Sequence, residues 1–200
     1  MEHVFEAAPS GRSKCRGCKR LIGKGETRFG ERMPNPFADG EMTQWFHPLC
    51  AAYKRPEALL EAIAATAEAL DDRERLENEA NQTLGYPRLP RLTGAERASS
   101  GRARCRHCRQ AIAKSDWRIP LEFFNDGMIN AGGFIHATCA AAYFDTGNDT
   151  DDDTGNVFDR LLHFSEDLSD ADAEDLRLAV ERASETRGRA FESRRDRQGR

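Results

Sequence analysis

Three things are scarce in this 200-residue sequence: long apolar runs, aromatic residues and cysteines. No apolar run approaches the roughly 20 residues that a membrane-spanning helix needs, and the opening MEHVFEAAPS lacks the hydrophobic region of a signal peptide. We therefore expect an intracellular protein of a reducing compartment (cytoplasm, nucleoid or nucleus) without a membrane partner. Aromatics at 8% beside 32% charged residues leave little material for a core, so something other than burial must help to stabilise the fold.

The six cysteines belong to an internal repeat, which becomes visible when the sequence is shifted against itself by 89 or 90 positions. A Cys-x-x-Cys pair and a later His-x-x-Cys pair occur in both copies. The first copy reads C-x2-C-x28-H-x2-C and the second C-x2-C-x27-H-x2-C. The members are Cys15, Cys18, His47 and Cys50 in the first copy, and Cys105, Cys108, His136 and Cys139 in the second.

Each quartet predicts a zinc site with three thiolates and one imidazole. Such a set completes the tetrahedral shell of Zn2+ and leaves no open position for a catalytic water. We expect two zinc ions per chain and no enzyme activity. Buried cysteines that act as small hydrophobes would not form matching quartets, and a thioredoxin-like redox pair would need a βαβ context. His107 lies inside the second Cys-x-x-Cys pair, but its counterpart is Gly17, so we interpret it as a spectator.

Basic residues gather around each Cys-x-x-Cys pair, although the net charge of the chain is -4. Residues 10–28 hold seven Lys or Arg and one acid, Glu26, and residues 97–118 hold seven with Asp116 alone. The net charge of one Cys3His site with Zn2+ accounts for only part of this surplus. The remainder predicts a phosphate-binding surface. The acids gather between 145 and 175, either as a solvated insertion or as a mimic of nucleic acid that covers one module.

These features predict an α+β fold of two small zinc-stabilised modules, each with short antiparallel strands and helices around its metal site. The expected order along the chain is module one at 1–84, a linker at 85–97, module two at 98–186 and a disordered basic tail at 187–200. Apolar spacing predicts a trailing helix over 56–70 in module one. A second trailing helix is expected to begin at Ser169, with Leu176 and Val180 in its apolar stripe.

The spacing resembles the zinc finger of poly(ADP-ribose) polymerases and DNA ligase III, a long-spaced module that recognises DNA strand breaks. Four further features are shared: Ser-Gly-Arg before the first cysteine, a later arginine, an apolar residue near Asp-Gly, and an aromatic residue two before the histidine. They are Ser10-Gly11-Arg12, Arg28, Phe37 with Asp39-Gly40, and Trp45 in the first copy, and Ser100-Gly101-Arg102, Arg118, Phe124 with Asp126-Gly127, and Phe134 in the second. The resemblance covers about residues 1–85 and 95–180, which leaves no room for the family's transferase domain.

The resemblance implies how each module would contact DNA. In the family, arginines hold backbone phosphates and an apolar loop lies against the base pair that is exposed at the break. The implied residues are Arg12, Arg28, Arg102 and Arg118 for phosphates, and Phe37 and Phe124 for stacking. The family's pair of apolar loop residues is reduced to one in each copy, and Phe123 is an alternative platform. Core packing competes as an interpretation of all three phenylalanines, and we favour it for Trp45 and Phe134.

The sequence thus predicts a non-enzymatic tandem zinc-finger protein that binds DNA strand breaks (nicks, gaps or ends), with one finger on each duplex stem. We expect a monomer on DNA, with a repair enzyme as a further partner. Two alternatives stay open: a zinc-scaffolded protein–protein interaction module, and a single-stranded nucleic-acid binder. The arginines favour break binding over an interaction scaffold, because a scaffold has no need to repeat them at the same spacing.

Overall fold

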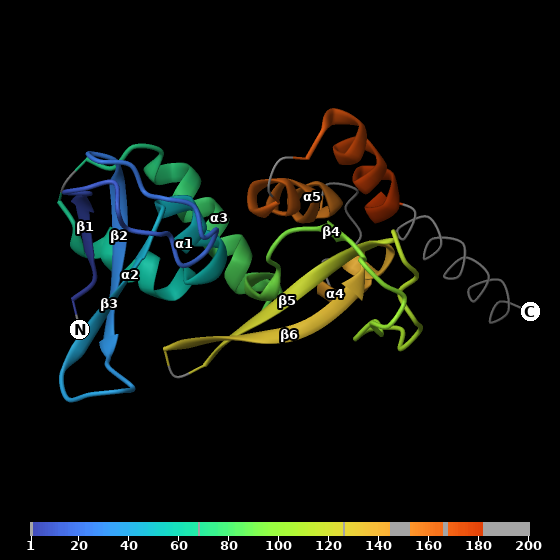
Figure 1. Cartoon of the computed structure of the whole chain (residues 1–200). Helices are drawn as coiled ribbons and strands as arrows, with labels where there is room; N and C mark the ends of the chain where they lie inside the picture. The colour runs from blue at the N-terminus through green and yellow to red at the C-terminus, as the bar shows by residue number, and fades with distance from the viewer. Residues whose placement is uncertain (1, 68, 126, 145–152, 166–167, 182–200) are drawn as a thin grey trace, which may run out of the picture. The chain divides into compact units, whose positions relative to one another are not determined.

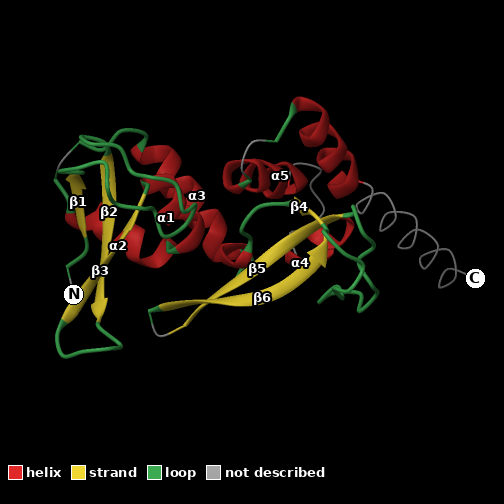
Figure 2. Cartoon of the chain, in the orientation of Figure 1, coloured by secondary structure: helices red, strands yellow, loops and turns green. Residues whose placement is uncertain are grey.

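The computed structural model describes all residues except 1, 68, 126, 145–152, 166–167 and 182–200. Two compact units divide the chain: Met1–Arg91 with Phe123–Asn130, and Leu92–Glu122 with Ala131–Arg200. Two three-stranded sheets, each accompanied by helices, make up the fold (Figures 1 and 2), which confirms the predicted α+β class with two small modules. One division, between Arg91 and Leu92, lies within the segment 85–97, and two others lie within residues 98–186, because Phe123–Asn130 belongs to the first unit.

The first sheet has the order β1-β2-β3 and is antiparallel throughout. Its strands are β1 (Val4–Ala7), β2 (Thr27–Pro34) and β3 (Glu41–Phe46). Phe29 on β2 is fully buried, and its ring lies 5.5 Å from that of Phe5 and 6.3 Å from that of Phe46. One position after Phe29, a Cβ on Gly30 would lie 2.6 Å from the Trp45 ring, so only glycine lets that indole cross the strand.

Three helices accompany this sheet: α1 (Pro48–Lys54), α2 (Pro56–Ala65) and α3 (Arg73–Gly85). The helix predicted over 56–70 begins at Pro56 as expected, because proline suits the first helical turn. It ends earlier than predicted, since the backbone is extended at Thr66. The third helix, α3, was not predicted, because its buried face consists only of Leu76, Ala80 and Thr83 in an otherwise polar segment.

The predicted linker 85–97 has structure of its own. It contains the short 3-10 helix η1 (Leu89–Arg91) and the first strand of the second sheet, β4 (Glu96–Arg97). Leu89 is buried at 2% exposure and anchors the segment.

The second sheet has the order β4-β5-β6, with β5 (Trp117–Asn125) and β6 (Met128–His136) as its long strands. The short helix η2 (Ala137–Cys139) and α4 (Ala140–Phe144) follow β6. The helix α5 (Asp153–Phe164) comes next and buries Val157 and Leu161. It was not predicted, because its first residues were counted as part of the acidic insertion.

A last described helix spans residues 170–181. It begins after Ser169 as predicted, and the Ser169 Oγ accepts a hydrogen bond of 3.1 Å from the Asp172 N–H. Leu176 and Val180 are buried, which confirms the predicted apolar stripe. Residues 145–152 and 166–167 of the acidic segment, and all of the predicted basic tail 187–200, lie outside the described residues.

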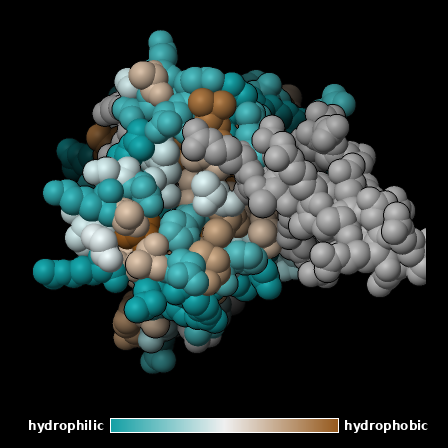
Figure 3. Space-filling model, turned by 90° about the vertical axis from the view of Figure 1, so that its right-hand side faces the viewer, coloured by the Kyte–Doolittle hydropathy of each residue, from teal (hydrophilic) through white to brown (hydrophobic). Residues whose placement is uncertain are grey.

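Hydrophilic side chains cover much of the described surface in Figure 3, with apolar residues in small groups between them. Of the helices that the structure describes, none is both long and apolar enough to cross a bilayer.

Candidate metal centres and nucleic-acid interface

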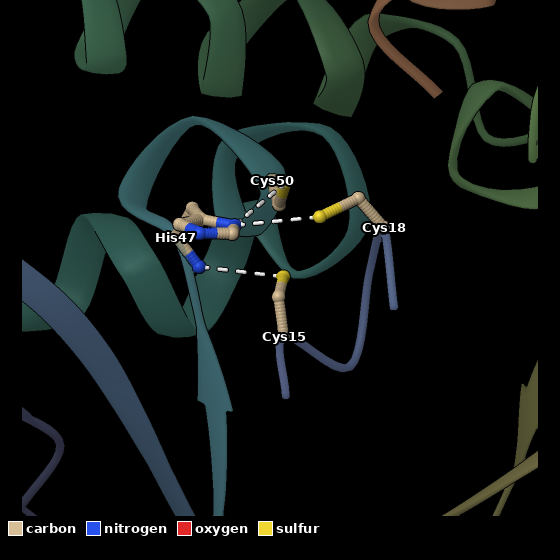
Figure 4. A group of neighbouring side chains, drawn as sticks. All are labelled: Cys15, Cys18, His47 and Cys50. Carbon is tan, nitrogen blue, oxygen red and sulfur yellow. Dashed lines mark hydrogen bonds between the residues drawn. The ribbon is translucent and has the colours of Figure 1, made fainter. Parts of the chain in front are cut away.

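The four predicted ligands of the first copy converge on one point (Figure 4), with their ligand atoms within 4.8 Å of one another. Cys15 and Cys18 lie on a tight turn, whose backbone is closed by a 2.8 Å hydrogen bond from Cys15 N to Arg20 O. His47 follows β3 and Cys50 lies in α1. The turn, the strand and the helix therefore supply the ligands from three directions.

The orientation of His47 identifies Nδ1 as its ligand atom. Nδ1 lies 3.4 Å from the Cys18 Sγ and 3.9 Å from the Cys50 Sγ. The other ring nitrogen, Nε2, lies 3.6 Å from a carboxylate oxygen of Glu26. That carboxylate is itself held by a 2.7 Å hydrogen bond from Gly23 N, so Glu26 is placed to orient the imidazole.

The second quartet repeats this geometry. His136 Nδ1 lies 3.4 Å from the Cys108 Sγ and 4.0 Å from the Cys139 Sγ. The His136 backbone N–H donates to the Cys105 Sγ at 3.4 Å, as the His47 N–H does in the first site. The outer partner differs, because His136 Nε2 lies 3.1 Å from the backbone oxygen of Ala111, whereas His47 Nε2 lies beside the Glu26 carboxylate.

Both cysteine turns contain a left-handed residue directly after the second cysteine. Lys19 has a φ of 65° and Arg109 a φ of 66°. This region favours glycine, so each turn holds a basic side chain at a conformational cost. His107 is exposed and is not among the converging ligands of its site, in agreement with its interpretation as a spectator.

The two sites differ in how well they are covered. All three cysteines of the first site are buried, whereas Cys108 and Cys139 of the second are half-buried. In the first site, a Cβ on Gly17 would lie 3.0 Å from the Cys50 Cβ and 3.6 Å from Lys54, so α1 packs closely over the turn. In the second site, the residues that correspond to α1 form η2 and the short α4.

The electrostatics of both quartets favour a bound cation. Burial raises the pKa of the Cys139 thiol to about 12, and the negative charge of Cys105 adds to this effect. Burial alone would raise the pKa of the Cys105 thiol. Backbone hydrogen bonds from Cys108, His136 and His107 outweigh this effect and lower that pKa to about 7. In the first site, the hydrogen bond with Cys15 raises the pKa of His47 to about 10. Three crowded sulfurs cannot all be thiolates without a neutralising charge.

Three sulfurs and one imidazole nitrogen at these distances fit a tetrahedral Zn2+. Zinc would supply structural stabilisation at both positions, because the protein fills all four coordination positions. The prediction of two Cys3His zinc sites is therefore confirmed by the geometry of both quartets.

Arg28, one of the implied phosphate contacts, is only 6% exposed. Its Nε donates to the Glu6 carboxylate at 3.1 Å and its Nη1 to the Ser13 Oγ at 2.7 Å. The guanidinium carbon lies 3.5 Å from the centre of the Trp45 ring. Trp45, for which the sequence favours core packing, is half-buried and supports this arginine.

Arg118 repeats the arrangement in the second copy. Its Nε donates to the Glu96 carboxylate at 2.8 Å, and its guanidinium carbon lies 3.9 Å from the centre of the Phe134 ring. Sequence reasoning missed both glutamates, although Glu6 and Glu96 stand at the same 90-residue offset as the arginines. That offset was the signal that could have identified them.

The other two implied phosphate contacts, Arg12 and Arg102, are exposed. Each lies in the turn that precedes its first cysteine. They therefore differ from Arg28 and Arg118, whose charges are already paired with carboxylates.

The three candidate stacking residues lie in different surroundings. Phe37, in the loop between β2 and β3, is 78% exposed, and its N–H donates to the Asn35 Oδ1 at 3.0 Å. Phe124 belongs to the first unit and is half-buried, with the guanidinium carbon of Arg55 3.8 Å from its ring centre. Phe123 is exposed. Of the three, Phe37 offers the most open ring.

The first module is similar to a known family of zinc fingers. Residues 6–85 match the model of the family described as "Poly(ADP-ribose) polymerase and DNA-Ligase Zn-finger region". The chain is 30% identical to a poly [ADP-ribose] polymerase of Sarcophaga peregrina over 60% of its length. It is 29% identical to poly [ADP-ribose] polymerase 1 of Oryza sativa subsp. japonica over 68% of its length. A shorter stretch, 32% of the chain, is 39% identical to poly [ADP-ribose] polymerase 1 of Gallus gallus. The chain spans 14% of the length of the Sarcophaga and Oryza proteins.

Proposed function

Since residues 6–85 match the poly(ADP-ribose) polymerase and DNA-ligase zinc-finger model, and the second quartet repeats the ligands of the first, we propose that this protein binds DNA at strand breaks. The proposed activity is binding without catalysis, in an intracellular compartment that contains DNA. One chain acts as a monomer, with one finger on each duplex stem of a nick or gap. A repair enzyme is the partner that such a complex would recruit.

The observation that carries this proposal is the exposure of Phe37. A phenyl ring that is 78% exposed gains little from the protein's own core. At a strand break the terminal base pair presents an open face, and stacking on it is worth about 1–3 kcal/mol without regard to sequence. Phe124, or Phe123 beside it, has the corresponding role in the second copy.

Phosphate contacts supply the rest of the proposed interface. Arg12 and Arg102 are exposed and approach the backbone directly, whereas Arg28 and Arg118 are held flat on aromatic rings by Glu6 and Glu96. An arginine whose position is fixed in advance loses little entropy when it meets a phosphate. The exposed pair would therefore contribute most of the salt dependence, and the held pair most of the orientation.

A gel-shift series on the zinc-loaded protein tests the proposal. Four probes share one sequence: a nicked duplex, a duplex with a one-nucleotide gap, an intact duplex whose ends are blocked by hairpins, and a single strand. We expect the nicked and gapped probes to bind at least about fivefold more tightly than the blocked intact duplex, since a single stack provides 1 kcal/mol or more. Equal affinity for nicked and intact duplex would contradict break recognition, and preference for the single strand would favour that alternative.

A further inference from the structure

The helix 170–181 packs against the second sheet at a pair of residues that have no counterpart in the first copy. The pair is Arg97 on β4 and Trp117 on β5, which are cross-strand partners. The corresponding partners of the first sheet are Ala7 and Thr27. The zinc-finger scaffold thus forms in the first copy without this cation and this indole, so they are not required by the fold of the module.

The geometry of the pair is that of an anion receptor. The guanidinium carbon of Arg97 lies 3.9 Å from the centre of the Trp117 ring, so the cation is stacked on the indole face. The Arg97 Nη2 and the Trp117 Nε1 both donate to one carboxylate oxygen of Asp175, at 2.7 and 2.9 Å. A second carboxylate, that of Asp172, accepts from the same Nη2 at 3.2 Å. Two donors and a positive charge therefore converge on oxygens that the helix supplies.

The two aspartate carboxylates are bound weakly enough for another anion to replace them on Arg97. Side-chain exposure is 43% for Arg97, 45% for Asp172 and 48% for Asp175. Ion pairs that are half-exposed are worth little, since both partners stay in contact with water. The helix has other anchors, because Leu176 and Val180 are buried. The two aspartates can therefore turn away from Arg97 while the helix stays in place.

We propose that Arg97 is an additional phosphate contact of the second module, which Asp172 and Asp175 occupy when DNA is absent; Trp117, which is 6% exposed, supports its guanidinium from beneath. The ligand is a phosphodiester of the DNA backbone, whose anionic oxygens accept the same hydrogen bonds as a carboxylate. Arg97 is the first of the seven basic residues between 97 and 118, and its neighbour Glu96 holds Arg118. Neighbouring residues of a strand point to opposite faces, and Arg118 is the cross-strand partner of Glu96, so Arg97 and Arg118 cannot share one phosphate.

The inference rests on the proposed DNA binding and adds a competitor within the chain. Asp172 and Asp175 lower the apparent affinity for DNA, because a backbone phosphate must displace them. The acidic segment thereby acts as a mimic of nucleic acid at one defined position of the second module.

The decisive comparison uses two doubly substituted proteins with equal changes in charge. Asp172→Asn with Asp175→Asn frees Arg97, whereas Glu174→Gln with Glu181→Gln removes two carboxylates that pair with Arg177 on the same helix. At fixed salt, the aspartate variant should bind nicked duplex about three- to tenfold more tightly than the wild type, because two weak competing pairs are lost. The glutamate variant should gain less than about twofold, from long-range charge alone.

Two further measurements assign the effect to the proposed position. Adding Arg97→Gln to the aspartate variant should abolish the gain and lower the log–log salt slope by about 0.9. In a Trp45→Phe background, which copies Phe134 of the second module, Trp117 is the remaining tryptophan, and its emission should shift as DNA displaces Asp175. Circular dichroism and zinc content show whether each variant is folded. If the double aspartate variant does not fold, Asp175→Asn alone decides the question, since it removes the shorter Arg97 pair and keeps the hydrogen bond from the Ser169 Oγ to Asp172 at the start of the helix.

The results separate this inference from the proposed function. If the wild type binds nicked DNA and a folded aspartate variant gains no more than the glutamate variant, the phosphate position is wrong while break binding stands. If the wild type binds no DNA, both fail. An unchanged Trp117 emission on saturation with DNA would also overturn the phosphate position.

Discussion

The Glu6 carboxylate accepts a hydrogen bond from the Nε of Arg28 on the neighbouring strand, and Glu96 accepts one from Arg118 in the same way 90 residues later. In both copies, an aromatic ring covers one flat face of the guanidinium, while the carboxylate binds its edge. Because this ion pair occurs in both modules, we interpret it as part of the fold that the two zinc modules share. In each sheet it joins the first strand to the central strand, β1 to β2 and β4 to β5.

We expect Arg28→Ala to destabilise the protein by about 1–3 kcal/mol, since it removes a charged hydrogen bond and the stack on Trp45. A double-mutant cycle with Glu6→Gln in chemical denaturation should give a coupling free energy of about 1 kcal/mol, because Glu6 is partly exposed. Arg28→Lys should recover only part of the loss, because an ammonium cannot stack flat on the indole. Strictly additive single substitutions would contradict a functional pair.

Exposed and paired arginines should differ in their effect on salt dependence. Arg12→Ala and Arg102→Ala should each reduce the log–log slope of DNA affinity against salt by about 0.9, as the loss of one phosphate contact requires. The matched control is Arg75→Ala, which removes an equally exposed arginine from α3, outside the basic clusters. A slope that is the same for all three variants would show that these two arginines do not contact phosphates.

Removal of the exposed ring at position 37 separates stacking from folding. Phe37→Ala should leave stability within about 0.5 kcal/mol of the wild type, because the ring is mostly in water already. Affinity for nicked duplex should fall by about 1–3 kcal/mol, and affinity for intact duplex should not change. Leu84→Ala, which truncates an exposed apolar residue of α3, is the control and should affect neither. Undiminished preference for the nick would shift the stacking role to another residue.

For the second finger, Phe123→Ala and Phe124→Ala should be compared in the same assay. Phe124 lies under Arg55 and is half-buried, so its truncation should cost stability as well as nick preference. A loss of nick preference only in the Phe123 variant would identify that residue as the platform.

The two zinc ions should leave at different rates. Both are structural, so complete chelation should unfold both modules, as followed by circular dichroism. The second site should release its ion first, because Cys108 and Cys139 are half-buried while the cysteines of the first site are buried. Release from the single-site variants Cys18→Ser and Cys108→Ser, measured with a colorimetric zinc indicator, isolates the second and the first site in turn. Faster release from the first site would contradict this assignment.

The metal centres were predictable from sequence because the ligand identities and spacings nearly determine the geometry. Two residues between ligands fit one tight turn, and the internal repeat showed that all six cysteines have a shared role. The helix at Ser169 was equally accessible, since a capping residue and an apolar stripe coincide there. Local patterns of this kind predict the structure well because the features that they indicate depend on few long-range contacts.

Other features depend on contacts between distant segments and gave no such signal. The α3 helix has only three buried positions, and its formation depends on packing against α1 and α2. The pairing of Arg97 with Asp172 and Asp175 joins residues 75 and 78 positions apart, and no local pattern indicates it. The burial of Arg28 was missed for the same reason, since a basic residue in a basic cluster is expected to face solvent.

The left-handed residues at 19 and 109 mean that the observed sequence is not the most stable one for its own turns. Glycine at either position would avoid a backbone cost of about 1–2 kcal/mol. A programme of thermostabilisation would therefore choose Lys19→Gly and Arg109→Gly early, and each choice would remove a cation beside a cysteine ligand. A more heat-resistant protein with weaker attraction for polyanions is the expected product, so melting temperature is a poor guide for improving this molecule.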